Sequence, residues 1–146
     1  MNAPYIRIVR CPYEEPHLLN LCWDVSNGHQ RGSLEVYIDR EELLDWAKHL
    51  EKFPRHATDV FLAQVGSEHP EDRFAYYFRF RAFTTNSVGH CALHVRFNNN
   101  EKLPDRAISE FCISAEAAQI NRLGGLFRNF SDLRHQILLW TPESGK

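Results

Sequence analysis

The amino-acid sequence predicts an α+β fold, in which an antiparallel sheet of about six to seven strands carries two helices on one face as a two-layer sandwich. Strand-like segments come in two runs, and an amphipathic helix follows each run. This order differs from the alternating strand and helix units of parallel sheets. The chain has 146 residues, 43% of them hydrophobic, which suits one core. We therefore expect residues 1–146 to form a single domain.

The first run contains three expected strands, residues 5–11, 18–25 and 33–39. In the first of them the period of two places Ile6, Ile8 and Arg10 on one face. Between the second and third, the dipeptide Asn27-Gly28 marks a chain reversal, because these residue types favour tight turns. The three strands are therefore expected to lie antiparallel.

The first helix is expected to begin after Asp39, whose carboxylate stands three residues before Glu42 in the spacing of a capping box. Apolar residues then recur at steps of three and four as far as Phe53, and Pro54 ends the helix. Trp46 lies beside this apolar stripe, and we expect it to cover the edge between helix and sheet.

The second run contains four expected strands, residues 60–68, 74–85, 89–98 and 106–114. The two middle segments alternate strictly, and the short link 84–88 between them allows only antiparallel pairing. Matching their apolar faces predicts a register in which Phe78 pairs with Val95, Phe80 with Leu93 and Arg79 with His94.

The second helix is expected over residues 115–130, with Ser114 as its N-cap. Gly124 and Gly125 interrupt the apolar stripe at a cost of about 1 kcal/mol each, and they would let the helix sit close on the sheet. Residues 136–140 are apolar and precede a proline, so they form either an edge strand or an extended tail packed on the domain.

The best candidate for function is the outward face of the central hairpin. Residues 74–98 contain three arginines and no acidic residue, and arginine next to aromatic rings suits recognition of carboxylates or phosphates. The first 73 residues carry 8 Lys and Arg against 13 Asp and Glu, and the last 73 carry 9 against 6. The candidate partner-binding residues are Tyr77, Arg79, Arg81, Phe83, His94 and Arg96. A second interpretation stays open, in which these side chains form salt bridges with the acidic N-terminal half of the same molecule or are simply solvated.

No catalytic, metal or cofactor site is predicted. His90 and His94 lie about 13 Å apart on an extended strand, too far to share one ion, and no serine or cysteine nucleophile motif occurs. The four cysteines show no CxxC spacing, and we expect reduced thiols, with Cys22 and Cys91 as small core residues. A disulfide between Cys11 and Cys22 needs their segments to form a hairpin, and the lack of a secretion signal disfavours it.

Partner classes are limited by charge and hydropathy. The net charge of -2 opposes nucleic-acid binding, and no apolar run is long enough to cross a membrane. A cytoplasmic protein that binds a protein partner or a second copy of itself is the first hypothesis. The competing hypothesis is a small-molecule sensor or enzyme, with a pocket between sheet and helices lined by Trp23, Trp46 and Tyr77.

The order of elements also resembles that of a diffuse family of small, uncharacterised bacterial cytosolic proteins, some of which are described as immunity proteins to polymorphic toxins. The segments that carry the resemblance fall within residues 18–130 and are Gly32 to Ile38, Leu43 to Trp46, Leu50, Phe53-Pro54, Gly89-His90 and Phe111 to Ser114. The resemblance implies an antiparallel sheet with helices and a function exercised by binding a protein. Its motifs are structural, so it transfers no site residues.

Overall fold

The structure of the protein is a computed structural model that describes residues 3–12 and 14–142. It confirms the α+β class, with eight strands, two helices and a short 3-10 helix. In chain order the elements are β1 (Tyr5–Cys11), β2 (Leu19–Ser26), β3 (Arg31–Ile38), α1 (Arg40–Glu51), β4 (Val60–Gly66), η1 (Pro70–Asp72), β5 (Tyr77–Thr84), β6 (His90–Asn98), β7 (Ile108–Glu116), α2 (Ala117–Phe130) and β8 (Ile137–Trp140).

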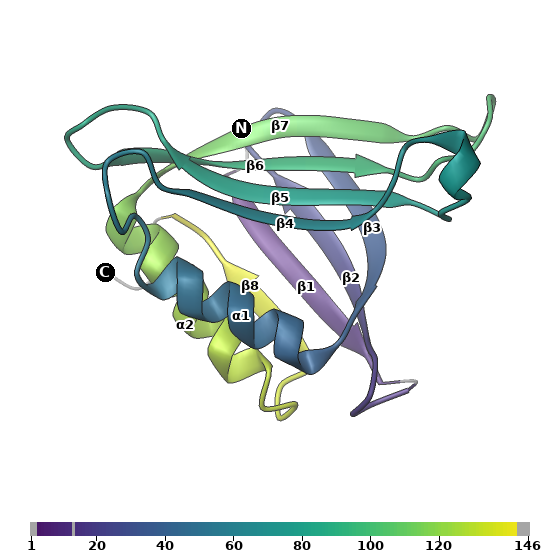
Figure 1. Cartoon of the computed structure of the whole chain (residues 1–146), viewed down its shortest axis with the longest axis horizontal. Helices are drawn as coiled ribbons and strands as arrows, with labels where there is room; N and C mark the ends of the chain where they lie inside the picture. The colour runs from purple at the N-terminus through teal and green to yellow at the C-terminus, as the bar shows by residue number, and fades with distance from the viewer. Residues whose placement is uncertain (1–2, 13, 143–146) are drawn as a thin grey trace.

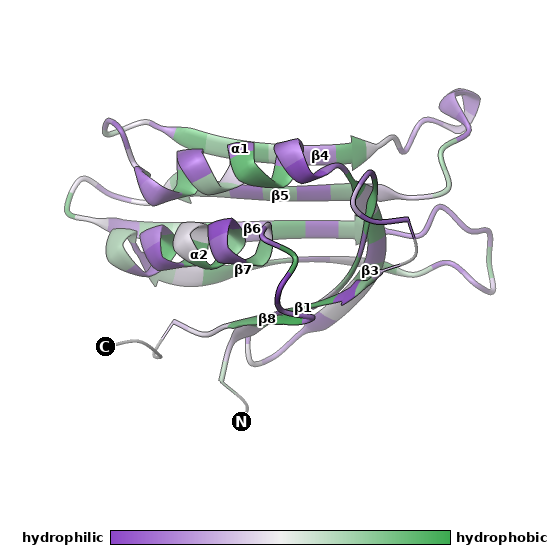
Figure 2. Cartoon of the chain, turned by 90° about the horizontal axis from the view of Figure 1, so that it is seen from below, coloured by the Kyte–Doolittle hydropathy of each residue, from purple (hydrophilic) through white to green (hydrophobic). Residues whose placement is uncertain are grey.

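The strands form two antiparallel sheets where the sequence predicted one. Sheet A has the order β3-β2-β1-β8 and sheet B the order β4-β5-β6-β7. In Figure 1 the strands of sheet A cross obliquely beneath sheet B, with both helices beside them. The strands before α1 pair with one another in sheet A and β4 to β7 pair in sheet B, while β8, which follows α2, joins sheet A beside β1. Figure 2 shows the helices lying across the inner face of sheet B.

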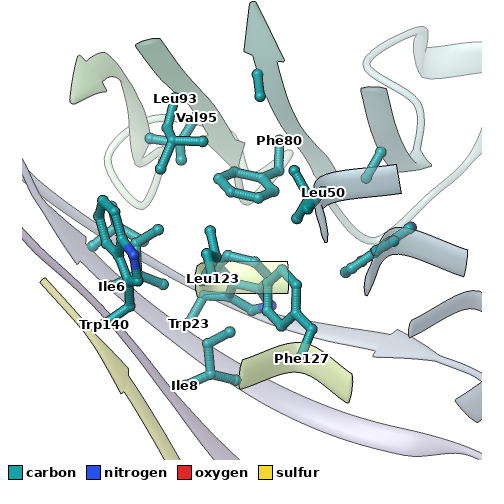
Figure 3. Close-up of a cluster of buried hydrophobic side chains, with 14 of the residues drawn as sticks. Ile6, Ile8, Trp23, Leu50, Phe80, Leu93, Val95, Leu123, Phe127 and Trp140 are labelled. Atoms are coloured by element: carbon teal, nitrogen blue, oxygen red, sulfur yellow. The ribbon is translucent and has the colours of Figure 1, made fainter. Parts of the chain in front are cut away.

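The core lies where sheet A, sheet B and the helices meet, and Trp23 of β2 is at its centre (Figure 3). Its ring centroid lies 4.9 Å from Phe78 and 5.3 Å from Phe80, both in sheet B. The same ring lies 6.4 Å from Trp46 of α1 and 6.1 Å from Phe127 of α2. Trp46 is therefore a core residue and not the cover of a helix edge, because three neighbouring elements close over it.

The first helix begins as predicted, and the second begins two residues later than predicted. Asp39 caps α1, since its carboxylate accepts a hydrogen bond of 2.7 Å from the backbone N–H of Glu42. Ser114 does not cap α2, because β7 continues its pairing with β6 as far as Glu116. Glu116 and Gln119 form the capping box of α2 in its place.

The two helices pack closely against each other at Gly124. A Cβ atom built on Gly124 would lie 2.6 Å from the backbone N of Glu51 and 3.0 Å from the carbonyl O of Ala47, whereas one built on Gly125 meets nothing within 4 Å. The glycine thus lets α2 approach α1. The expected approach to the sheet is wrong, because the atoms nearest to Gly124 belong to α1.

The register of the central hairpin is shifted by two residues from the prediction. The structure pairs Phe78 with Phe97, Phe80 with Val95, Arg79 with Arg96 and Arg81 with His94. The loop is longer than expected, because the side-chain Oδ1 of Asn86 accepts hydrogen bonds from the backbone N–H groups of Val88 and His90 and so holds a wider turn. An even shift leaves each side chain on its predicted face. The strand also begins at Tyr77, three residues later than predicted.

The structure also tests the expectations for the C-terminal apolar segment and for the cysteines Cys22 and Cys91. Residues of β8 pair with β1, so the C-terminal apolar segment is an edge strand and not an unpaired tail. Cys91 is buried as expected. Cys22 is half-buried on the outer face of sheet A, because its neighbour Trp23 points into the core and successive strand residues face opposite sides. The expectation of a core position for Cys22 is therefore wrong.

Candidate functional site

The candidate residues share one surface, the outer face of sheet B. Cross-strand pairing places Arg79 beside Arg96 and Arg81 beside His94, while Phe80 and its alternating neighbours point into the core. Tyr77 and Phe83 lie on the same outer face, two residues on either side of the arginine pair in β5. All six predicted side chains therefore belong to one surface.

Two glutamates enter this face from neighbouring segments and neutralise part of its charge. Glu110 of β7 lies opposite Arg96 and is 2.8 Å from its Nη1, and it is 3.3 Å from Nη2 of Arg79. Glu68, which follows β4, is 2.9 Å from Nε of Arg96 and also accepts a hydrogen bond from Asn98. The structure therefore bears out pairing with the acidic N-terminal half for Arg96, through Glu68, whereas Glu110, which pairs with both Arg79 and Arg96, comes from the C-terminal half.

Neither glutamate was predicted as a member of this face, because both lie outside the two strands from which the candidate residues came. Glu110 and Glu68 lie outside residues 74–98, and they reach the face through strand pairing and a loop. The pairing of the strand after the hairpin was the available signal, because Glu110 falls on the same alternation as the outward residues of that strand.

His94 connects the cationic and anionic parts of the face from a buried position, with 6% of its surface exposed. Its Nδ1 accepts a hydrogen bond of 3.0 Å from Nε of Arg81, and its Nε2 lies 2.7 Å from a carboxylate oxygen of Glu110. Burial lowers the pKa of His94, and the charges of Arg81 and Arg79 act in the same direction, against the hydrogen bond to Glu110. The neutral imidazole with a proton on Nε2 satisfies both contacts. This hydrogen bond is also the main cause that lowers the pKa of Glu110.

Arg81 differs from the other two arginines in having no carboxylate within ion-pair distance among the residues the structure describes. Its guanidinium carbon lies over the ring of Phe83, 4.8 Å from the ring centroid, in a cation–π contact. The pairing between β4 and β5 places Leu62 opposite Arg81 and Val60 opposite Phe83. Leu62 is 49% exposed and Val60 47% exposed.

Tyr77 contributes to the base of the face more than to its surface. Its side chain is buried, and its hydroxyl donates a hydrogen bond of 2.7 Å to Oε1 of Gln64 in β4. The guanidinium carbon of Arg79 lies 5.8 Å from the centroid of the Tyr77 ring. Tyr77 therefore orients Arg79 and Gln64 and offers little area to a partner.

The predicted pocket between sheet and helices is not formed by the three side chains suggested for it. Trp23 and Trp46 contact each other within the packed core, where large side chains fill the space. Tyr77 lies on the opposite face of β5. The three residues do not converge on a common cavity, because the alternation of β5 separates Tyr77 from the core residue Phe78.

One open cavity of about 540 Å³ lies at the end of sheet B, between η1 and the loop that joins β6 to β7. Asn100 fixes its walls by donating hydrogen bonds to the carbonyl groups of Ser67 and Phe74. The lining mixes Arg73, Lys102 and Arg106 with acidic and apolar side chains. Within residues 3–12 and 14–142, no three metal-ligating side chains come together.

A second polar cluster surrounds Asp59, directly before β4. This buried carboxylate accepts hydrogen bonds from the backbone N–H and the guanidinium of Arg55, and it lies 3.2 Å from Nε2 of His49. The hydrogen bonds from Arg55 are the main cause that holds the pKa of Asp59 well below its usual range. The cluster anchors the chain between α1 and β4.

Comparisons with family models, with curated proteins and with solved structures give no match for this chain. None of the helices in the part of the chain that is described has the length and apolar character needed to cross a membrane.

Proposed function

We propose that the chain is a non-enzymatic protein-binding module, immunity-like in the sense of the family it resembles, which engages an acidic partner through the outer face of sheet B. The observation that carries this proposal is the state of Arg81. Its charge meets no carboxylate in the described residues, and its side chain is already ordered against Phe83.

The Arg81 side chain is already ordered in the free protein, and this favours the binding of a partner. A guanidinium that is stacked on a ring and hydrogen-bonded to His94 loses little rotamer freedom when a carboxylate arrives. Arginine and aromatic residues are also enriched among the side chains that dominate interface energies. The exposed Leu62 and Val60 lie directly beside this cation, so a partner can bury apolar surface around the ion pair.

The charge of Arg81, which no carboxylate in the described residues balances, favours an acidic partner over symmetric self-association. In a two-fold dimer built on this surface, the same patch would meet itself and oppose like charges around Arg81. A partner surface with a carboxylate and apolar neighbours would complement both properties of the patch. We propose that this chain and its partner meet in the bacterial cytoplasm.

Charge reversal tests the proposal. The variant Arg81→Glu should lose the proteins that co-purify with the wild-type chain from its native cells, as measured by quantitative mass spectrometry. Arg7→Glu is the matched control, because Arg7 is an exposed arginine on sheet A that undergoes the same change of charge. Circular dichroism and thermal melting should show that both variants remain folded.

The proposal is refuted if Arg81→Glu keeps every partner and the same oligomeric state, measured by light scattering, while it stays folded. The immunity-like part has its own test. If a toxin gene neighbours the gene of this chain, expression of the chain together with the toxin should protect the cell from the toxin. The variant Arg81→Glu should abolish this protection, while Arg7→Glu should retain it.

A further inference from the structure

We propose that Cys11 and Cys22 form a peroxide-oxidisable thiol pair, which closes to a reversible disulfide on the outer face of sheet A. This site is separate from the outer face of sheet B and does not depend on the function proposed for it. The sulfur atoms of the two residues lie 3.9 Å apart, close to van der Waals contact.

The pairing of β1 with β2 brings these thiols together. Cys11 is opposite Asn20 and Cys22 is opposite Val9, so the two cysteines are diagonal neighbours on one face of the sheet. Both side chains are half-buried, which leaves the sulfur atoms within reach of a small oxidant and of each other. The hairpin that the sequence analysis required for this pair is therefore present.

Closing the bond requires a small movement of the end of β1. Diagonal neighbours have Cα atoms about 7–8 Å apart, slightly more than the ~7 Å limit for an undistorted disulfide. Cys11 is the last residue of β1, and the next residue, Pro12, has no N–H group to donate to the sheet. The ladder between β1 and β2 ends at the pair of Cys11 with Asn20, so the movement has to strain only this last pair and breaks no hydrogen bond from Pro12. A bond formed under such constraint is easily reduced, which makes the closure reversible.

The other two cysteines lack this arrangement and provide controls. Cys91 is buried, and its sulfur contacts the carbonyl O of Gly89 at 3.6 Å. Cys112 is exposed on the outer face of sheet B. In the described part of the chain, the two cysteine sulfur atoms that contact each other are those of Cys11 and Cys22.

The oxidation proceeds in two steps with hydrogen peroxide as the oxidant. In the first, the thiolate of Cys11 attacks one peroxide oxygen, the O–O bond breaks, and sulfenic acid and hydroxide form. In the second, the sulfur of Cys22 attacks the sulfur of the sulfenic acid, the S–O bond breaks, and the departing hydroxyl takes the thiol proton as water. Burial, with a hydrogen bond to Cys11, raises the pKa of Cys22 to about 11, so Cys22 keeps its proton until this step.

Mass spectrometry of the full chain tests the proposal. The reduced protein is treated with hydrogen peroxide, its remaining thiols are alkylated, and it is digested without reductant. We expect the loss of two alkylatable thiols, a cross-linked peptide that joins Cys11 to Cys22, and full reversal by dithiothreitol. The variants Cys91→Ser and Cys112→Ser should form the same cross-link to the same extent.

The variant Cys22→Ser separates the two steps. It should form no cross-link and should accumulate a sulfenic acid on Cys11, which dimedone traps. The proposal is overturned if peroxide converts wild-type Cys11 to sulfinic acid without a link to Cys22, or if the only disulfide formed joins Cys112 of two molecules.

Discussion

Replacing Gly124 by alanine should destabilise the protein, whereas the same replacement at the adjacent Gly125 should stabilise it. Both residues lie within α2, and alanine is favoured over glycine in a helix by about 1 kcal/mol. The new methyl group at Gly125 meets open space, so this gain is retained in full. With about 2–4 °C for each kcal/mol in a chain of this size, we expect a melting temperature higher by about 3 °C.

At Gly124 the methyl group meets the backbone of α1. A contact of 2.6 Å with the backbone N of Glu51 can be relieved only if the helices move apart, because that atom cannot rotate away. Overpacking of this kind costs about 1–3 kcal/mol, and a backbone neighbour places it near the upper end. After subtraction of the helix gain, Gly124→Ala should lower the free energy of unfolding by about 2 kcal/mol.

Thermal and urea denaturation, followed by circular dichroism, would measure both variants. The two free energies of unfolding should differ by about 3 kcal/mol, with opposite signs relative to the wild type. If Gly124→Ala is as stable as Gly125→Ala, the close packing of α1 and α2 at this point is refuted.

Three further outcomes are expected from polar contacts. Asp39→Ala should lower the free energy of unfolding, measured by urea denaturation, by about 1 kcal/mol. Asp39→Asn should retain most of the stability of the wild type, because its side-chain oxygen can still accept a hydrogen bond from the backbone N–H of Glu42. The pKa of His94 is lowered in the fold, so its contribution to stability is present above the unfolded value of about 6.5 and is lost as the pH falls below it. His94→Gln should flatten this part of the stability profile, and an unchanged profile would contradict the assignment. The pKa of Asp59 is also lowered, so Asp59→Asn should cost about 2 kcal/mol at pH 7, and equal losses at pH 7 and pH 3 would contradict this role.

Alternation and caps could be predicted from the sequence because they depend on neighbouring residues. The period of two assigned Phe80 and Arg81 to opposite faces, and this assignment survives the error in register because the shift is even. The cap at Asp39 is likewise local, since it needs only the N–H group of Glu42. The start of α2 was missed because the pairing of β7 with β6 overrides the capping preference of Ser114.

The division into two sheets could not be predicted, and the ion pairs of the arginines could be expected only in general terms, because both depend on contacts between distant segments. Nothing local in residues 136–140 indicates that they pair with β1. The position of Glu110 beside His94 and Arg96 requires the register of a strand pair whose loop gives no tight-turn signal. The partner-binding role of the outer face of sheet B stays a prediction.

The pairing of β1 with β8 has a consequence for biosynthesis. β1 is translated first among the described elements, but one of its two neighbours in the sheet, β8, is translated last among them. Until then the backbone of Ile6, Ile8 and their neighbours lacks its hydrogen-bonding partner on that side. The nascent chain must therefore carry an open strand from the synthesis of β1 until that of β8, which is the interval in which a chaperone that shields such edges would have the most to protect.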